Sequence, residues 1–248
     1  MTRSRGLGDV YKRQLYIYKD KLELSSNVSN FIENQIIQSI KIKDRFQFCV
    51  SGGSTPKSVY QLLSKRDIEW EKVDIFLGDE RCVDPKSELS NSLMLRNSLL
   101  TEYGSKAFFY EIFSDKKVDD NISKKLLISK LIEKCNSNSN PPSFDLTLLG
   151  LGDDGHTASL FPYQKNNNVD DLVIFNEGKG LKRISLTPKV LSASTNIMFL
   201  VSGASKQLAL KRLLDKNESL ERTPSKLIKS SNPISIFCDE ESSKELLI

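Results

Sequence analysis

The only histidine of the chain lies in a polar loop whose residue types suit acid–base chemistry. His156 follows Asp153, Asp154 and Gly155, and the loop comes after the apolar run at residues 144–149. An imidazole can accept and return a proton near neutral pH, and a neighbouring carboxylate can orient it and stabilise its charged form. His156 and Asp154 are therefore our candidate catalytic residues. A structural role for the histidine is the competing interpretation.

A second polar turn has the residue types that bind an anion. After the apolar run at residues 46–50 the chain reads Ser51 and then Gly52, Gly53, Ser54 and Thr55. Glycines let the backbone approach a ligand closely, and the free N–H groups of a helix N-terminus favour a negative charge. The turn lacks the endings of nucleotide-binding glycine motifs, so we expect a phosphate cradle without a nucleotide. The alternative is an ordinary strand-to-helix turn capped by Ser54 or Thr55.

Charged residues after two further apolar runs could complete such a site. Asp79, Glu80 and Arg81 follow the run at residues 73–77, and adjacent residues on an extended turn point in different directions. One carboxylate can therefore face the site while the other pairs locally. Lys206 lies near the start of an expected helix, where its charge could contact a phosphate. The alternatives are a surface salt-bridge cluster and a solvated lysine.

Two other chemistries are disfavoured by the sequence. Cys49, Cys82, Cys135 and Cys238 are widely spaced, with no Cys-x-x-Cys pair, so we expect free thiols in a reducing compartment and no structural zinc. The chain also lacks the Gly-x-Ser-x-Gly elbow of serine hydrolases, and any serine triad would have to use His156. We expect neither a metal nor a cofactor.

Short apolar runs alternate with helix-period segments along the chain, which is typical of repeated βα units. We predict strands at 15–18, 46–50, 73–77, 108–111, 144–149, 182–186, 196–201 and 234–238. Helices are predicted at 26–40, 54–65, 91–101, 122–134, 203–214 and at the C-terminal end. The expected fold is a three-layer, Rossmann-like α/β domain with a mostly parallel sheet. Ligands of such sheets bind outside the carboxyl ends of the strands, where the polar turns can converge.

Length and charge set the domain organisation and the classes of partner. The 248 residues show no composition break, so we predict one domain over residues 15–248. Residues 9–14 resemble an in-frame translation of a sequencing adaptor, and we treat residues 1–14 as a non-native or disordered extension. The net charge is +4, and four basic residues against one acidic residue place +3 of it in that extension. The sequence has no basic patch, and no apolar run approaches the roughly 20 residues of a membrane span. We therefore expect neither nucleic-acid nor membrane partners. We expect a cytoplasmic protein that is a monomer or a weak homo-oligomer.

Five motifs taken together resemble one known family. They are Ser51 to Pro56, Gly78 to Val83 with Ser90 and Asn91 downstream, Gly150 to Pro162, Arg183 to Thr187, and Gly203 to Lys206. Their order and spacing are similar to those of the 6-phosphogluconolactonases in the glucosamine-6-phosphate isomerase/6-phosphogluconolactonase family. The resemblance implies a fold like that of the glucosamine-6-phosphate deaminases. It also implies hydrolysis of 6-phospho-D-glucono-1,5-lactone, a phosphorylated sugar lactone, in the oxidative pentose phosphate pathway.

The resemblance assigns roles to individual residues. It implies that His156 and Asp154 are catalytic, and that no metal takes part. The residues it implies for substrate and phosphate binding are Gly52, Gly53, Ser54, Thr55, Asp79, Arg81, Gly155, Arg183 and Lys206.

The same resemblance supplies the main alternative functions. The related deaminases share the Asp-Gly-His core, but they carry a glutamate where this chain has Phe161 and a tyrosine where it has Arg81. This difference favours hydrolysis over isomerisation. A glucosamine-6-phosphate deaminase is the first alternative. A sugar-phosphate sensor without catalysis is the second, and the lack of a DNA-binding segment argues against it.

Overall fold

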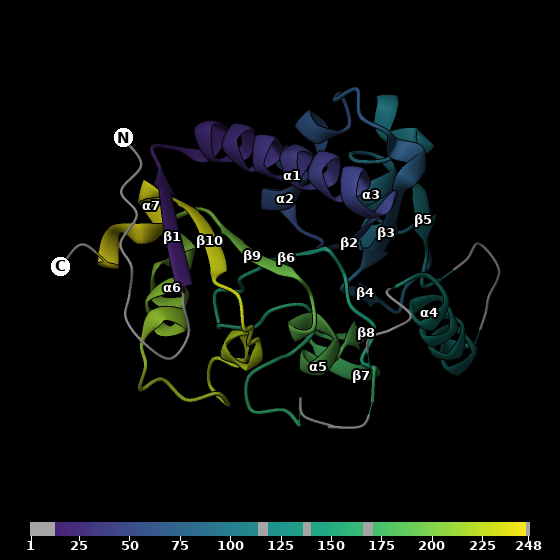
Figure 1. Cartoon of the computed structure of the whole chain (residues 1–248). Helices are drawn as coiled ribbons and strands as arrows, with labels where there is room; N and C mark the ends of the chain where they lie inside the picture. Colours follow the sequence, from purple (N-terminus) through teal and green to yellow (C-terminus); the bar gives the residue numbers. More distant parts are fainter. Residues whose placement is uncertain (1–12, 114–118, 136–139, 166–170, 247–248) are drawn as a thin grey trace.

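A sheet of seven parallel strands runs through the centre of the molecule (Figure 1). The computed structural model describes residues 13–113, 119–135, 140–165 and 171–246. The strand order is β1-β10-β9-β6-β2-β3-β5. The bounds are Arg13–Tyr18 (β1), Ile234–Asp239 (β10), Asn196–Val201 (β9), Leu146–Gly150 (β6), Phe46–Val50 (β2), Val73–Leu77 (β3) and Phe108–Tyr110 (β5).

The central strands are apolar because both faces of the sheet are covered. Every residue of β2 and β3 is buried, as expected for a parallel sheet with helices on both sides. The predicted bounds of β2, β3 and β9 are confirmed, and those of the other strands shift by one or two residues. The predicted α/β fold with a mostly parallel sheet is confirmed.

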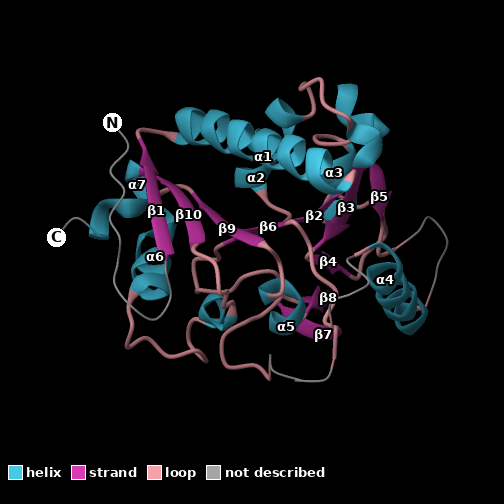
Figure 2. Cartoon of the chain, in the orientation of Figure 1, coloured by secondary structure: helices cyan, strands magenta, loops and turns pink. Residues whose placement is uncertain are grey.

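Helices flank the sheet on both sides (Figure 2). α1, α2 and α3 lie on one side, and α4 and α6 lie on the other. Their bounds are Lys21–Lys43 (α1), Ser54–Leu63 (α2), Asn91–Arg96 (α3), Asp120–Lys134 (α4), Pro188–Ser192 (α5), Gln207–Leu214 (α6) and Glu240–Ser243 (α7). α1 begins five residues before its predicted start, because the Asp20 carboxylate accepts hydrogen bonds from the N–H groups of Leu22 and Glu23, each at 2.9 Å.

A second, antiparallel sheet is the main feature that the sequence did not predict. It consists of β4 (Asp79–Arg81), β8 (Leu181–Leu186) and β7 (Val173–Gly178), in that order. The run at 182–186 belongs to this sheet, and residues 79–81, predicted as a turn, form its edge strand. A three-residue strand carries no periodic signal, which explains why β4 was missed.

One hydrophobic core joins the two sheets. The core contains Phe48 and Ile75 of the central sheet together with Val173 and Ile184 of the small one. Among the described residues, no helix is both long enough and apolar enough to cross a bilayer.

The start of the domain differs from the prediction by two residues. Arg13 and Gln14 were assigned to the extension, but they form the beginning of β1 and pair with Ile234 and Ser235 of β10. Pairing at this edge uses backbone groups, so it does not depend on the polar side chains that suggested an extension. Residues 1–12 lie outside the described part of the chain.

Candidate active site

Four polar turns meet at one edge of the central sheet. β9, β6, β2 and β3 are neighbours and run parallel, so the segments that follow them leave the sheet side by side. The His156 loop follows β6, the Gly52–Gly53 turn follows β2, Gly78 follows β3 and Gly203 follows β9. The predicted convergence of the turns at the carboxyl edge is therefore confirmed.

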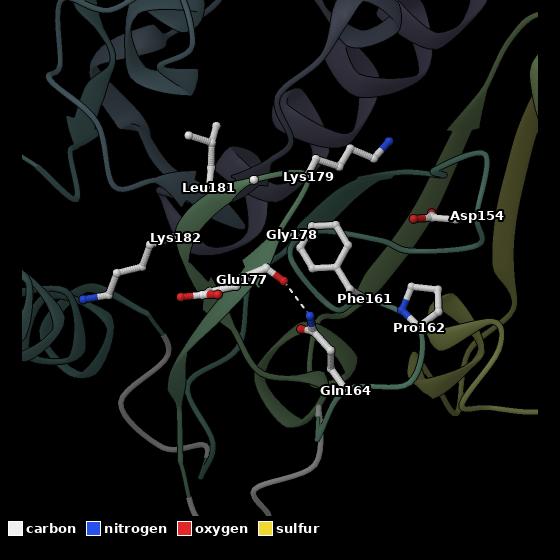
Figure 3. Close-up of a pocket in the computed structure, with 10 residues that line it drawn as sticks. Asp154, Phe161, Pro162, Gln164, Glu177, Gly178, Lys179, Leu181 and Lys182 are labelled. Carbon is white, nitrogen blue, oxygen red and sulfur yellow. Dashed lines mark hydrogen bonds between the residues drawn. The ribbon is translucent and has the colours of Figure 1, made fainter.

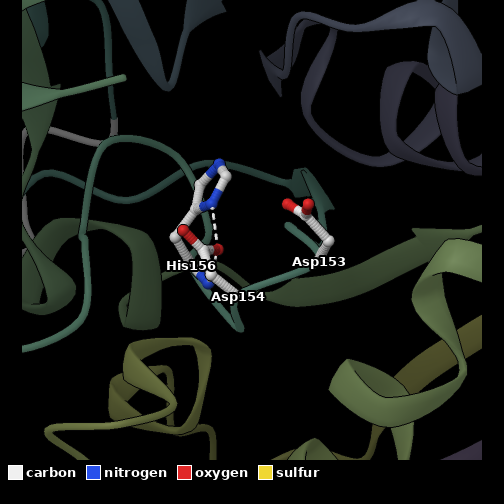
Figure 4. Close-up of side chains that lie close together, drawn as sticks. All are labelled: Asp153, Asp154 and His156. Carbon is white, nitrogen blue, oxygen red and sulfur yellow. Dashed lines mark hydrogen bonds and ion pairs between the residues drawn. The ribbon is translucent and has the colours of Figure 1, made fainter. Parts of the chain in front are cut away.

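His156 and Asp154 form a hydrogen-bonded pair in the loop after β6 (Figure 4). His156 Nδ1 lies 2.5 Å from Asp154 Oδ1, and the backbone N–H of His156 donates to the same oxygen at 3.0 Å. A carboxylate only accepts, so the proton belongs on Nδ1 and the other ring nitrogen, Nε2, is left as an acceptor. The His156 side chain is 18% exposed, which leaves it accessible without being fully solvated.

The hydrogen bonds from His156 keep the Asp154 carboxylate ionised. Partial burial alone would raise the pKa of Asp154, but the hydrogen bonds from His156 lower this pKa to about 2. Asp154 is therefore ionised at neutral pH, and it can stabilise a protonated imidazole.

Two glycines allow the loop to bring the pair together. A Cβ atom on Gly152 would lie 2.0 Å from His156 Nδ1, so a side chain there would displace the imidazole. Gly155 has φ 92°, a conformation that L side chains rarely adopt, and its carbonyl accepts a hydrogen bond from the N–H of Ser225 at 3.1 Å. Gly155 therefore shapes the loop, while its predicted contact with substrate stays a prediction.

The carboxylates of Asp79 and Glu80 are both buried and both pair within the protein, and the predicted contact of Asp79 with substrate stays a prediction. Glu80 is 1% exposed, and it accepts hydrogen bonds from the N–H groups of Arg81, Asn91 and Ser92 at 2.7–2.8 Å. Burial raises the pKa of Glu80, although these hydrogen bonds oppose the shift. Because both carboxylates are buried, the alternative of a surface salt-bridge cluster is wrong for this pair.

Asp79 faces the His156 loop. Its carboxylate accepts a hydrogen bond from Ser159 Oγ at 2.5 Å, and Arg183 Nη1 lies 3.8 Å from the same oxygen. Ser159 in turn accepts from Asn176 through its carbonyl oxygen, at 2.7 Å. Asp79 thus connects the small sheet to the loop that carries the imidazole.

The turn after β2 leaves the N-terminus of α2 without a side-chain cap. Gly53, with φ 116°, is the N-cap residue, and among the residues that the structure describes no side chain caps the first N–H groups of the helix. Ser54 and Thr55 lie inside the first turn, so their predicted capping role is wrong. Ser54 and Thr55 line a cavity of about 480 Å³ together with Gly203 and Ser202 of the β9 turn. Lys19, Asp20, Lys21, Asp239 and Glu241 also line it.

Position 52 must be glycine because the Asn91 side chain lies where a Cβ atom would be. A Cβ atom at this position would lie 1.9 Å from Asn91 Oδ1. The Asn91 side chain is held in place because its Nδ2 donates to the Asp79 carbonyl at 2.9 Å. The Asn91 side chain therefore occupies the space that a side chain at position 52 would need. Asn91 is part of one of the sequence motifs, but no role was predicted for it.

Three cations take different positions around the site. Lys206 is half-buried beside Asp153 and Asp154; burial lowers its pKa, and the acidic neighbours oppose that shift. Arg183 is 6% exposed, and burial lowers its pKa as well. Arg81 donates from Nη1 to the Leu89 carbonyl at 2.7 Å. Lys206 thus belongs to the turn after β9 and interacts with the acidic residues of the His156 loop, whereas Arg81 and Arg183 belong to the small sheet.

A second cavity adjoins the His156 loop on the side of the β7–β8 hairpin (Figure 3). Its volume is about 710 Å³, and it is lined by Asp154, Phe161 and Lys179 among others. Phe161 and Lys179 were not among the predicted site residues. Nothing in the sequence marks them as site residues, because Phe161 is an apolar residue in a polar motif and Lys179 is one of many lysines.

Asp153, Asp154 and His156 are also a donor set of the kind that binds metal ions. One ligand atom from each lies within 4.8 Å of the others (Figure 4). Asp154 already accepts from His156 Nδ1, and Asp153 pairs with Lys179 at 3.1 Å. These contacts use one oxygen of each carboxylate and Nδ1 of the imidazole, and the expectation of a metal-free site stays a prediction.

Comparison with known proteins supports the resemblance seen in the motifs. The family described as Glucosamine-6-phosphate isomerases/6-phosphogluconolactonase matches residues 19–236. A 6-phosphogluconolactonase from Nostoc sp. is 31% identical over 241 residues, which cover 96% of this chain and 100% of the relative. The crystal structure of a 6-phosphogluconolactonase from Shewanella baltica has a TM-score of 0.79 and 25% identity, covering 94% of this chain and 100% of that one.

The deaminase-like fold is also confirmed. The structure of a monomeric glucosamine-6-phosphate deaminase has a TM-score of 0.73 at 19% identity, covering 93% of this chain and 99% of that one. At this identity the likeness concerns the fold alone.

Proposed function

Because the chain belongs to the glucosamine-6-phosphate isomerases/6-phosphogluconolactonase family, we infer that it is a 6-phosphogluconolactonase, a lactone hydrolase of the pentose phosphate pathway. The observation that carries the assignment of its chemistry is the hydrogen bond between His156 and Asp154 in the loop after β6, at the carboxyl edge of the sheet. The substrate is 6-phospho-D-glucono-1,5-lactone and the product is 6-phospho-D-gluconate.

His156 acts as the base and then as the acid of the reaction. Nε2 accepts a proton from a water molecule as the water oxygen bonds to the lactone carbonyl carbon. When the tetrahedral intermediate collapses, the bond to the ring oxygen breaks and Nε2 returns the proton to that oxygen. Catalysis of this kind typically contributes on the order of 100- to 10,000-fold. An ester carbonyl is already electrophilic, so these steps require no cofactor.

Asp154 acts through His156. Its ionised carboxylate accepts from Nδ1–H in the resting state, which keeps the lone pair on Nε2. When Nε2 takes the proton, the carboxylate lies next to the new positive charge and stabilises it.

The phosphate group binds away from the reacting carbon. The free N–H groups at Gly53, Ser54 and Thr55 point a helix N-terminus toward it, and Lys206 adds a positive charge from the β9 turn. Arg81 and Arg183 contribute further positive charge from the small sheet. Binding energy from this remote group holds the lactone in place for attack by water.

The experiment compares two reactions of the purified protein. We expect hydrolysis of the lactone above the spontaneous rate, measured as acid release, and no ammonia from glucosamine 6-phosphate. Ammonia release without lactone hydrolysis would identify a deaminase. Binding of sugar phosphates with neither reaction would identify a sensor.

We also propose that the enzyme is cytoplasmic and acts as a monomer or weak homo-oligomer. The four cysteines are free thiols, which suits a reducing compartment. Sedimentation at two protein concentrations, with activity measured in parallel, tests this expectation.

A further inference from the structure

Phe161 connects the catalytic loop to the β7–β8 hairpin (Figure 3). Its ring is buried, with its centroid 4.8 Å from that of the His156 imidazole and the two planes at 36°. The guanidinium carbon of Arg183, in β8, lies 5.4 Å from the same ring centroid. The Phe161 ring therefore touches both the imidazole and the hairpin.

The hairpin is built to receive this ring. A Cβ atom on Gly178 would lie 2.1 Å from a carbon of the Phe161 ring, so the ring packs directly on the backbone of β7. The Gly178 carbonyl also accepts a hydrogen bond from Arg183 Nε at 3.2 Å. The glycine and the arginine thus fix the position of Phe161 from the side of the hairpin.

One hydrogen bond does not by itself orient an imidazole. The contact between Asp154 and Nδ1 leaves the ring free to tilt about the hydrogen bond, and tilting moves Nε2, which must meet the attacking water. A ring packed against the imidazole restricts that tilt. A displacement of about 1 Å at a reacting group can lower a rate by about 100-fold.

We propose that Phe161, backed by Gly178 and Arg183, is a positioning residue that holds His156 with Nε2 aimed at the water. This inference rests on the proposed role of His156 in lactone hydrolysis. The competing explanation is that Phe161 only fills space in the core. The two explanations differ in which kinetic constant changes and in whether the imidazole itself is disturbed.

Two variants disturb the contact from opposite sides, and a third serves as a matched control. Phe161→Leu removes the ring, and Gly178→Ala pushes a methyl group against it. Phe175→Leu removes a ring from the other face of β7, where the contact is with Lys182 Nζ at 4.7 Å. Phe175 has the same kind of cation contact as Phe161 but lies outside the proposed site.

The single histidine makes the imidazole directly observable by NMR. A tag-free protein labelled with ¹⁵N-histidine gives signals from one imidazole ring, and these signals report its tautomer. For Phe161→Leu and Gly178→Ala we expect a 10- to 100-fold lower kcat, a KM within twofold of wild type, and shifted or broadened imidazole ¹⁵N signals. Phe175→Leu should leave all three measurements unchanged. Melting temperatures show whether each variant is folded at the assay temperature.

Three results would overturn the proposal. They are a kcat within twofold of wild type in both variants, a lower kcat with unchanged imidazole signals, and an equal loss in Phe175→Leu. Failure of the proposed function is a separate result, because the wild type would then not hydrolyse the lactone. The NMR comparison would still show whether Phe161 holds the imidazole in place. If Phe161→Leu does not fold, Gly178→Ala decides the question with the same measurements.

Discussion

At the scale of single residues, the site depends on one carboxylate oxygen that serves one histidine twice. Asp154 Oδ1 accepts from both the backbone N–H and Nδ1 of His156. The first hydrogen bond sets the loop and the second sets the tautomer of the ring. The conformation of the loop and the tautomer of the ring thus depend on the same atom, while the tilt of the ring depends on its packing.

Replacing His156 should remove catalysis and leave binding in place. For His156→Ala we expect kcat to fall on the order of 100- to 10,000-fold, because the water loses its base. The proposed phosphate contacts lie on other turns, so the dissociation constant for 6-phosphogluconate, measured by calorimetry, should stay within a few-fold of wild type. Full retained activity would contradict the catalytic role of His156.

The lowered pKa of Asp154 predicts how the stability of the protein depends on pH. Its pKa is about 2 in the folded protein, below the ordinary value of 3.8, so its charged form stabilises the folded state. This contribution is complete above pH 3.8 and is lost as the pH falls toward 2. In urea titrations, the stability difference between wild type and Asp154→Asn should be larger at pH 5 than at pH 3, because Asp154 becomes protonated over that range. The Asp154 side chain is 38% exposed, so solvent screening keeps the difference small. A difference that grows between pH 5 and pH 3 would contradict the assignment.

At the scale of elements, two glycines at strand ends have different reasons to be glycine. A Cβ atom on Gly52 would collide with the held side chain of Asn91. A Cβ atom on Gly78 would make only ordinary contacts, the nearest being Cys49 Sγ at 3.5 Å. Gly52 therefore controls how closely α3 approaches the turn after β2.

This difference gives a matched pair of variants. We expect Gly52→Ala to destabilise the protein by about 1–3 kcal/mol and to raise KM, because Asn91 and the turn must move apart. Gly78→Ala should change the stability by less than about 0.5 kcal/mol, since its neighbours are at contact distance. Urea titration and steady-state kinetics measure both effects. Equal effects of the two variants would show that the contact with Asn91 is not the cause.

At the scale of the whole molecule, both sheets share one core. Val173 and Ile184 of the small sheet pack into the same cluster as Phe48 and Ile75 of the central sheet. The small sheet also holds the His156 loop through Asp79. The site is therefore coupled to the packing of the two sheets as a unit.

A shared core predicts cooperative unfolding. Trp70 is the only tryptophan and is fully buried, so its fluorescence reports the loss of the core. We expect the fluorescence, the circular dichroism signal and the enzymatic activity to be lost at the same urea concentration. Activity lost at a clearly lower urea concentration would show that the small sheet unfolds on its own.

The sequence by itself determined the βα repeat, the buried central strands and the motifs that identify the family. These features are local, because buried strands read as apolar runs and the polar turns follow them directly. It also identified the pairing of His156 with Asp154, since the two residues lie on one short loop.

Only the tertiary structure decided which distant groups meet. Three contacts join segments that are distant in sequence or belong to different elements. Asn91 packs against Gly52, Ser159 donates a hydrogen bond to Asp79, and Phe161 packs between His156 and Gly178. The second sheet likewise depends on pairing the short strand β4 with the distant β7–β8 hairpin, and pairing between distant segments leaves no periodic trace in sequence. Side-chain packing between such segments depends on where whole helices and strands lie in the fold. The residue types and spacing within one segment do not determine those positions.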